Sequence, residues 1–86
     1  MNINELIAIV KNKLKTKIVI QDLKIEDKSF LHKNHKSHQK GKFHLKVIIK
    51  SDELNKLSKI ESTKKVYSSL DLELKEHIHS IQILIN

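Results

Sequence analysis

Histidine is the side chain with the widest chemical scope in this 86-residue sequence. The six histidines form two groups, one in the middle of the chain and one near its end: His32, His35, His38 and His44, then His77 and His79. Neutral imidazole nitrogens bind zinc, copper, iron and nickel. The chain contains no cysteine, which excludes a thiolate nucleophile, a disulfide and a cysteine-ligated zinc. Any metal held by this chain therefore has nitrogen or oxygen ligands.

Positive charge is concentrated in the same middle segment. The 17 basic residues are all lysines, against 10 acidic residues, and residues 28–51 contain seven lysines and no acid. This excess favours an electrostatic partner such as nucleic acid or an acidic protein. Because guanine is read bidentately mainly by arginine, a chain without arginine is poorly suited to precise base reading. The lysines assigned to this candidate surface are Lys33, Lys36, Lys40, Lys42 and Lys46.

Two apolar periods predict the elements that position these residues. Helical spacing predicts a helix at about 3–15, and alternation predicts strands at about 22–27, 43–50 and 78–85. A short helical turn is expected at about 52–57 and a second helix at about 59–74, which begins at a capping box of Ser58 and Glu61. Residues 28–42 have no apolar period and are expected to form a long hairpin loop, a length that is more often functional than not.

This element order predicts a single α+β domain over residues 1–86, with a three-stranded mixed sheet covered by helices on one face. The longest apolar run, Leu6 to Val10, is far too short to cross a bilayer, and no basic segment precedes it as in a signal peptide. We therefore expect a soluble, cytoplasmic protein. Its lysine-, isoleucine- and asparagine-rich composition also suggests an AT-rich bacterial genome. Without a nucleophile elbow or an HExxH pattern, the chain is not expected to be an enzyme.

The topology predicts that five histidines meet at one end of the sheet. If the second and third strands are parallel, His44 and His79 open them at the same end, beneath the hairpin loop, with His77 beside them. Spacing alone favours modest roles for these residues. His79 is expected on the inward face as a core histidine, and His44 on the outward face as a sheet-surface residue. The loop histidines are expected to be solvated, with a mononuclear zinc site as the alternative.

Several segments, taken together, resemble the BolA family. They are LKIEDKS (23–29), His32 and His35, HLKVIIKSDEL (44–54), KVYSSL (65–70) and HIHSIQI (77–83). The resemblance covers about residues 23–85 and implies the BolA-like fold, which is related to the class II KH arrangement. It also implies a partner, a monothiol glutaredoxin, and a [2Fe-2S] cluster shared with that partner and glutathione, in iron homeostasis or cluster delivery. No cluster is expected on the chain alone.

The resemblance also implies which side chains bind the cluster. The ligands would be His79 and, from the loop, His32, with His35, His38 and His77 as alternates, because a chain without cysteine must be of the histidine-loop type. The sequence departs from the family pattern at Asn34, where many members have glycine, and at residues 62–64, which lack a basic RHR cluster. The alternative function is that of a BolA-type DNA-binding regulator. Any such binding should be weak and salt-dependent, since a single glycine cannot form a GXXG loop.

Overall fold

The computed structural model describes residues 2–29 and 43–86. Its elements in chain order are α1 (Ile3–Lys17), β1 (Asp22–Asp27), β2 (Phe43–Lys50), α2 (Asp52–Asn55), α3 (Lys59–Ser69), α4 (Asp71–Glu76) and β3 (Ile78–Ile85). The predicted loop histidines His32, His35 and His38, and the lysines Lys33, Lys36, Lys40 and Lys42, lie outside the described residues. No helix in the described part of the chain is long and apolar enough to cross a membrane.

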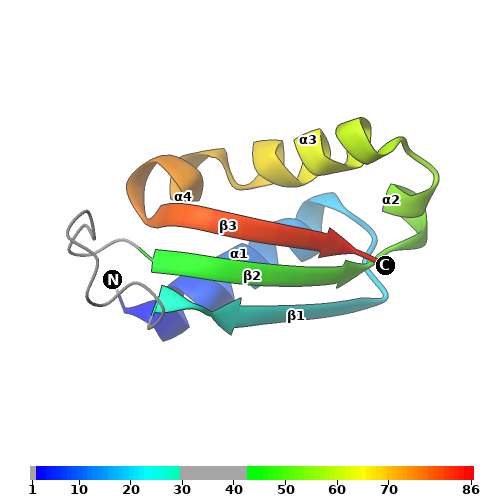
Figure 1. The fold of residues 1–86 in the computed structure, drawn as a ribbon. Coiled ribbons are helices and arrows are strands. Elements are labelled where there is room, and N and C mark those ends of the chain that lie inside the picture. The colour runs from blue at the N-terminus through cyan, green and yellow to red at the C-terminus, as the bar shows by residue number, and fades with distance from the viewer. Residues whose placement is uncertain (1, 30–42) are drawn as a thin grey trace.

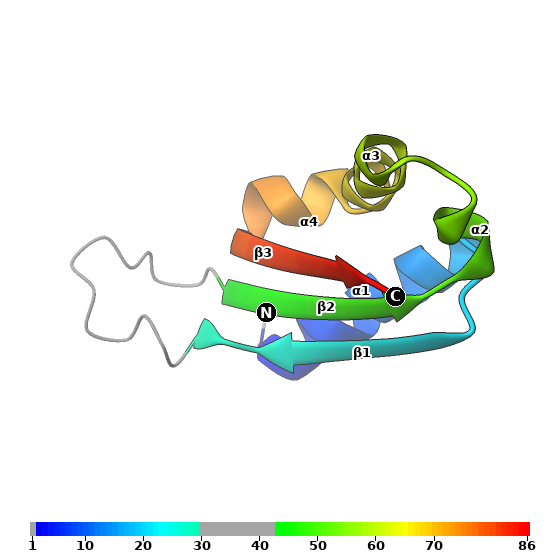
Figure 2. The ribbon, with the colours of Figure 1, turned by 45° about the vertical axis from the view of Figure 1, so that its right-hand side comes forward.

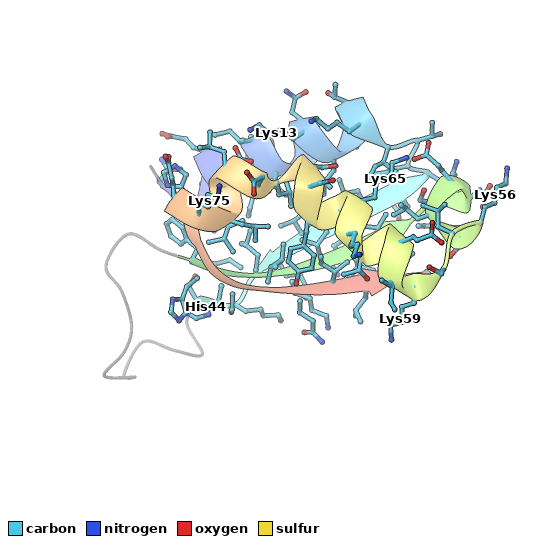
Figure 3. The ribbon with its side chains drawn as sticks, turned by 90° about the horizontal axis from the view of Figure 1, so that it is seen from above. Lys13, His44, Lys56, Lys59, Lys65 and Lys75 are labelled. Atoms are coloured by element: carbon cyan, nitrogen blue, oxygen red, sulfur yellow. The ribbon has the colours of Figure 1, made fainter. Side chains whose placement is uncertain are left out.

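The three strands form one mixed sheet in the order β1-β2-β3. β1 pairs antiparallel with β2, and β2 pairs parallel with β3. Helices α1, α3 and α4 lie on one side of this sheet, and its other face is left uncovered by the described helices (Figure 1, Figure 3). The predicted α+β class, with a three-stranded mixed sheet covered on one face, is confirmed.

The core lies between this sheet and the helices. Alternation along β2 buries Leu45, Val47 and Ile49, and the helical period of α1 buries a matching stripe. The buried apolar residues contributed by the helices are Leu6, Val10 and Leu14 from α1, Leu54 from α2, Val66 from α3 and Leu70 from the junction of α3 and α4. Burying each of these side chains contributes about 1.5–3 kcal/mol. β2 is the central strand because it pairs with both β1 and β3.

The helix expected at about 59–74 is divided in two at Leu70. This residue leaves helical geometry at φ −116° and ψ 20°, while its side chain is fully buried. The hydroxyls of Ser68 and Ser69 both donate hydrogen bonds to the carbonyl of Lys65, at 3.0 and 2.8 Å. Such bonds to a preceding carbonyl bend helices. The break lets α4 turn the chain down to the start of β3, where the histidines lie (Figure 2).

Ser51, between β2 and α2, makes one hydrogen bond to the α1–β1 connection and one to α2. Its side chain is fully buried; Oγ donates to the carbonyl of Val19 at 2.7 Å and accepts from the amide of Leu54 at 3.1 Å. Ser51→Ala removes both bonds, and we expect it to lower the free energy of unfolding by about 2 kcal/mol. Urea denaturation measures this loss. The exposed cap variant Ser58→Ala should cost about half as much, and equal losses would contradict the role of burial.

Glu53 and Lys65 form an ion pair between α2 and α3, with 2.7 Å between Oε2 and Nζ. The hydrogen bond from Lys65 lowers the pKa of Glu53 despite partial desolvation. Because the folded-state pKa is depressed, the stabilisation is complete above the ordinary glutamate pKa of about 4.3 and is lost as the pH falls through the lower folded-state value. We expect thermal melts of Glu53→Gln to differ most from wild type near neutral pH and to converge below about pH 4. A difference that grows on acidification would contradict this, and Asp52→Asn is the exposed control.

Candidate histidine site at the end of the sheet

Backbone hydrogen bonds bring the start of β3 to the hairpin end of β1 and β2. The amide of Phe43 donates to the carbonyl of His77 at 2.9 Å, and the amide of Lys28 donates to the carbonyl of His44 at 2.7 Å. Residues 29 and 43, which flank segment 30–42 in the sequence, therefore lie at the end of the sheet where β3 begins. His44, His77 and His79 share this end, as the predicted parallel pairing requires.

A β-bulge shapes the start of β3. Phe43 pairs with Ile78, but the next residue of β2, His44, pairs with Ser80, so His79 has no partner of its own in β2. A bulge leaves one extra residue on one strand and changes which face the following side chains occupy. Here it places His79 and Ser80 together opposite His44.

The bulge corrects the prediction that His79 is a core histidine. Ile78 takes the inward position and is only 4% exposed, whereas His79 is exposed. Beyond the bulge, the partly buried residues of β3 are the odd-numbered ones, Ile81, Ile83 and Ile85, as expected. The alternation that holds from Ile81 onward does not extend back to His79, because the bulge adds one residue there. His79 is thus available to a partner.

The second correction concerns His44, which was expected to be a sheet-surface residue. It does lie on β2 opposite the inward-facing set, but it is only 5% exposed (Figure 3). Its Nδ1 lies 2.6 Å from Ser80 Oγ in a hydrogen bond, and its ring contacts that of His79 edge-on, with centroids 4.9 Å apart and planes at 63°. Its backbone amide donates to Ser29 Oγ at 3.1 Å. Neighbours on both sides therefore cover a residue on the open face of the sheet.

His77 occupies a different environment from His79. It is the C-cap of α4, its side chain is 29% exposed, and its Nε2 lies 3.8 Å from Glu76 Oε2. In the described part of the chain, the paired imidazoles of this end are therefore His44 and His79. Residues 2–29 and 43–86 contain no group of three His, Cys, Asp or Glu side chains that could hold a metal ion.

Two lysines, Lys28 and Lys46, lie beside His44 on the open face. A shallow hollow of about 250 Å³ is lined by Lys28, His44, Leu45, Lys46, Ser80, Ile81 and Gln82. Glu26 borders it, with Oε1 3.3 Å from Lys28 Nζ and Oε2 3.6 Å from Lys24 Nζ. The hydrogen bond from Lys28 lowers the pKa of Glu26 against partial desolvation, with further lowering from the charges of Lys28, Lys24 and Lys46. Of the predicted surface lysines, Lys46 is the one described, and it lies beside His44.

A family model for BolA-like proteins matches residues 14–86. The chain belongs to the BolA family. Among curated proteins, no sequence matches it. Because the match begins within α1 and runs through β3, it includes both strands that present His44 and His79.

Solved BolA structures share this fold. The BolA domain of SufE1 from Arabidopsis thaliana is 23% identical, with a TM-score of 0.78 and coverage of 100% of this chain and 93% of that one. BolA1 from the same plant is 26% identical, with a TM-score of 0.78 and coverage of 92% and 87%. A Bol-like protein from Babesia bovis is 19% identical, with a TM-score of 0.71 and coverage of 91% and 79%. For this BolA-family chain, they establish a shared architecture.

The sequence contains a signal for the bulge that the alternation argument did not use. Ile78 and the isoleucines at 81, 83 and 85 have opposite parity, yet all are apolar. A regular strand cannot turn both sets inward, so one residue between them must be extra. In this chain, the change of parity between Ile78 and Ile81 places the extra residue at 79 or 80 and predicts that His79 leaves the inward face.

Proposed function

We propose that this chain binds a monothiol glutaredoxin and supplies histidine ligands to a [2Fe-2S] cluster that the two proteins share with glutathione. The proposal combines membership of the BolA family with one observation: an exposed imidazole, His79, lies where β3 meets both flanks of segment 30–42. The role is one of binding, in iron homeostasis or cluster delivery in the cytoplasm, rather than catalysis.

The donor set fits a cluster completed by another protein. His79 is exposed and can act as a ligand, while His44 is nearly buried and already bonded to Ser80. A second imidazole would come from His32, with His35, His38 or His77 as alternates. When bound, such a cluster carries one-electron chemistry whose reduction potential rises when imidazole replaces thiolate. This chain's own contribution is to present one imidazole nitrogen at the start of β3.

The charges near His79 are compatible with an acidic partner surface or an anionic cluster. Lys28 and Lys46 line the hollow beside His44, and Glu26 forms an ion pair with Lys28. Positive charge beside an anionic centre favours its binding. The partner's docking face is therefore expected to be acidic around its cluster position.

Anaerobic reconstitution tests the proposal. The full chain is mixed with a monothiol glutaredoxin, glutathione, ferrous iron and sulfide, and the product is analysed by size exclusion with visible absorption and circular dichroism. We expect a heterodimer whose spectrum differs from that of the glutaredoxin homodimer. Recovery of the homodimer spectrum alone, with this chain eluting separately, would refute the proposal.

DNA binding is the second candidate, supported by the lysines on the open face. If Lys28 and Lys46 contact phosphates, the logarithm of the binding constant should fall linearly with that of the salt concentration, and each lysine removed should reduce the slope by about 1. Fluorescence anisotropy with Lys28→Ala and Lys46→Ala measures this. Lys59→Ala, at the opposite end of the molecule from His44 (Figure 3), is the control. A slope that Lys46→Ala leaves unchanged would contradict this candidate.

A further inference from the structure

His44 is a buried histidine that neither ligand binding nor core packing explains. It is 5% exposed, on the side of the sheet that the helices leave uncovered. Polar side chains are rarely buried unless they are hydrogen-bonded, and a buried imidazole at a sheet end carries a desolvation cost. The contacts of His44 therefore indicate a specific task.

Hydrogen bonds to described residues of two other segments hold His44 in position. Its carbonyl accepts from the amide of Lys28 at 2.7 Å, its amide donates to Ser29 Oγ at 3.1 Å, and its ring Nδ1 is bonded to Ser80 Oγ at 2.6 Å. Ser29 is itself held, because its amide donates to Asp27 Oδ1 at 2.9 Å. His44 is thus anchored to β1 through its backbone and to β3 through its ring.

His79, by contrast, depends on its neighbours for its orientation. It is the extra residue of the bulge and has no partner in β2. The ring of His44 contacts its ring edge-on at 4.9 Å, and the bond from His44 to Ser80 holds the adjacent residue of the bulge. Among the described residues, both contacts come from one side chain, that of His44.

We propose that His44 is a positioning residue, which holds the β3 bulge and the ring of His79 in the orientation presented to a partner's metal centre. That His44 orients His79 is argued from this chain alone. That the orientation serves a partner's metal centre rests on the function proposed above. Groups that orient a metal ligand typically change metal affinity by 10–100-fold when they are removed. His44 would act through His79 without binding the metal itself.

The free chain provides a test that needs no partner. Side-chain couplings and ring-to-ring nuclear Overhauser effects measure the rotamer of His79 by NMR. We expect one rotamer and a His44–His79 ring contact in the wild type, and rotamer averaging of His79 in His44→Ala. Ser80→Ala, which removes only the hydrogen bond, and His44→Phe, which keeps only a ring, should each give partial averaging. Gln82→Ala, the next outward residue of β3, is the matched control and should change nothing.

The result that would overturn the proposal is a His79 rotamer that stays fixed in folded His44→Ala. If that variant does not fold, Ser80→Ala and His44→Phe decide the matter, because each preserves one of the two contacts. A fixed rotamer in both would equally refute it. A merely structural role of His44 would lower the melting temperature without affecting the order of His79 in variants that remain folded.

The shared cluster provides the second readout. In the glutaredoxin heterodimer, His44→Ala should reduce cluster retention by about 10-fold or more and alter the visible circular dichroism, with His44→Phe and Ser80→Ala intermediate. If the wild-type chain forms no heterodimer, the proposed function fails, while the NMR result still judges the positioning role. If the wild type forms the heterodimer and His44→Ala has the same spectrum and retention, the positioning role fails and the function stands.

Discussion

His79→Ala is expected to abolish the distinct spectrum of the heterodimer with a monothiol glutaredoxin. Removing a group that merely orients a ligand costs about 10–100-fold in metal affinity, so removing the ligand itself should cost at least as much. His79 is exposed, and exposed substitutions usually change the free energy of unfolding by no more than about 0.5 kcal/mol. The loss should therefore appear in a chain whose melting temperature is nearly unchanged.

His77→Ala is the matched control for this prediction. It removes a histidine two residues away, at the C-cap of α4, whose ring lies near Glu76. We expect this variant to retain the heterodimer spectrum. Anaerobic titration followed by visible circular dichroism compares the two variants at equal protein concentration. A spectrum lost in His77→Ala and kept in His79→Ala would transfer the ligand role to His77.

The order of the elements and the placing of His44 and His79 at one end of the sheet could be predicted from the sequence. Both depend on the spacing of apolar residues and on how the strands are connected. Alternation in β2 and the helical spacing of α1 are strong patterns, and a crossover between parallel strands returns the chain to the same end of the sheet. Those two facts are sufficient to bring His44 and His79 together. They do not determine which way each ring points.

The expected inward position of His79 is wrong because the bulge interrupts the alternation of faces at the start of β3. Continuing the parity of Ile81 places His79 inward. Alternation along β2 correctly places His44 outward, but it does not show that this residue is buried. The change of parity at Ile78 is visible in the sequence, so the exposure of His79 was recoverable. The burial of His44 was not, since it depends on Ser29 and Ser80, which reach it from two other segments.

The spacing of apolar residues also could not predict that the helix is divided at Leu70. No glycine or proline marks the break, which follows from two serine hydroxyls bonded to one carbonyl and from the burial of Leu70. The same break turns Glu73 of α4 inward, where it is 3% exposed. In the sequence, nothing distinguishes Glu73 from the neighbouring acids Asp71 and Glu76.

Lys13→Met is expected to destabilise the fold by about 2–3 kcal/mol, because it removes the partner of this buried carboxylate. Lys13 Nζ on α1 donates to Glu73 Oε2 at 2.5 Å, and Glu73 Oε1 is buried without a hydrogen-bond partner among the described residues. Breaking a fully buried pair costs about 3–5 kcal/mol, and the 36% exposure of the Lys13 side chain lets water offset part of that cost. The melting temperature should fall by roughly 10–20 °C.

A double variant separates the loss of the pair from the loss of packing. In Lys13→Met with Glu73→Leu, no charge is left buried, and apolar replacements of buried pairs are often neutral or stabilising. We therefore expect the double variant to recover most of the wild-type stability, a coupling that urea denaturation of the four proteins in the cycle measures. Lys11→Met, an exposed lysine on the same helix, should change the free energy of unfolding by less than about 0.5 kcal/mol. Losses that simply add in the double variant would mean that Lys13 and Glu73 act independently, and that the junction of α1 with α4 is held by apolar contacts alone.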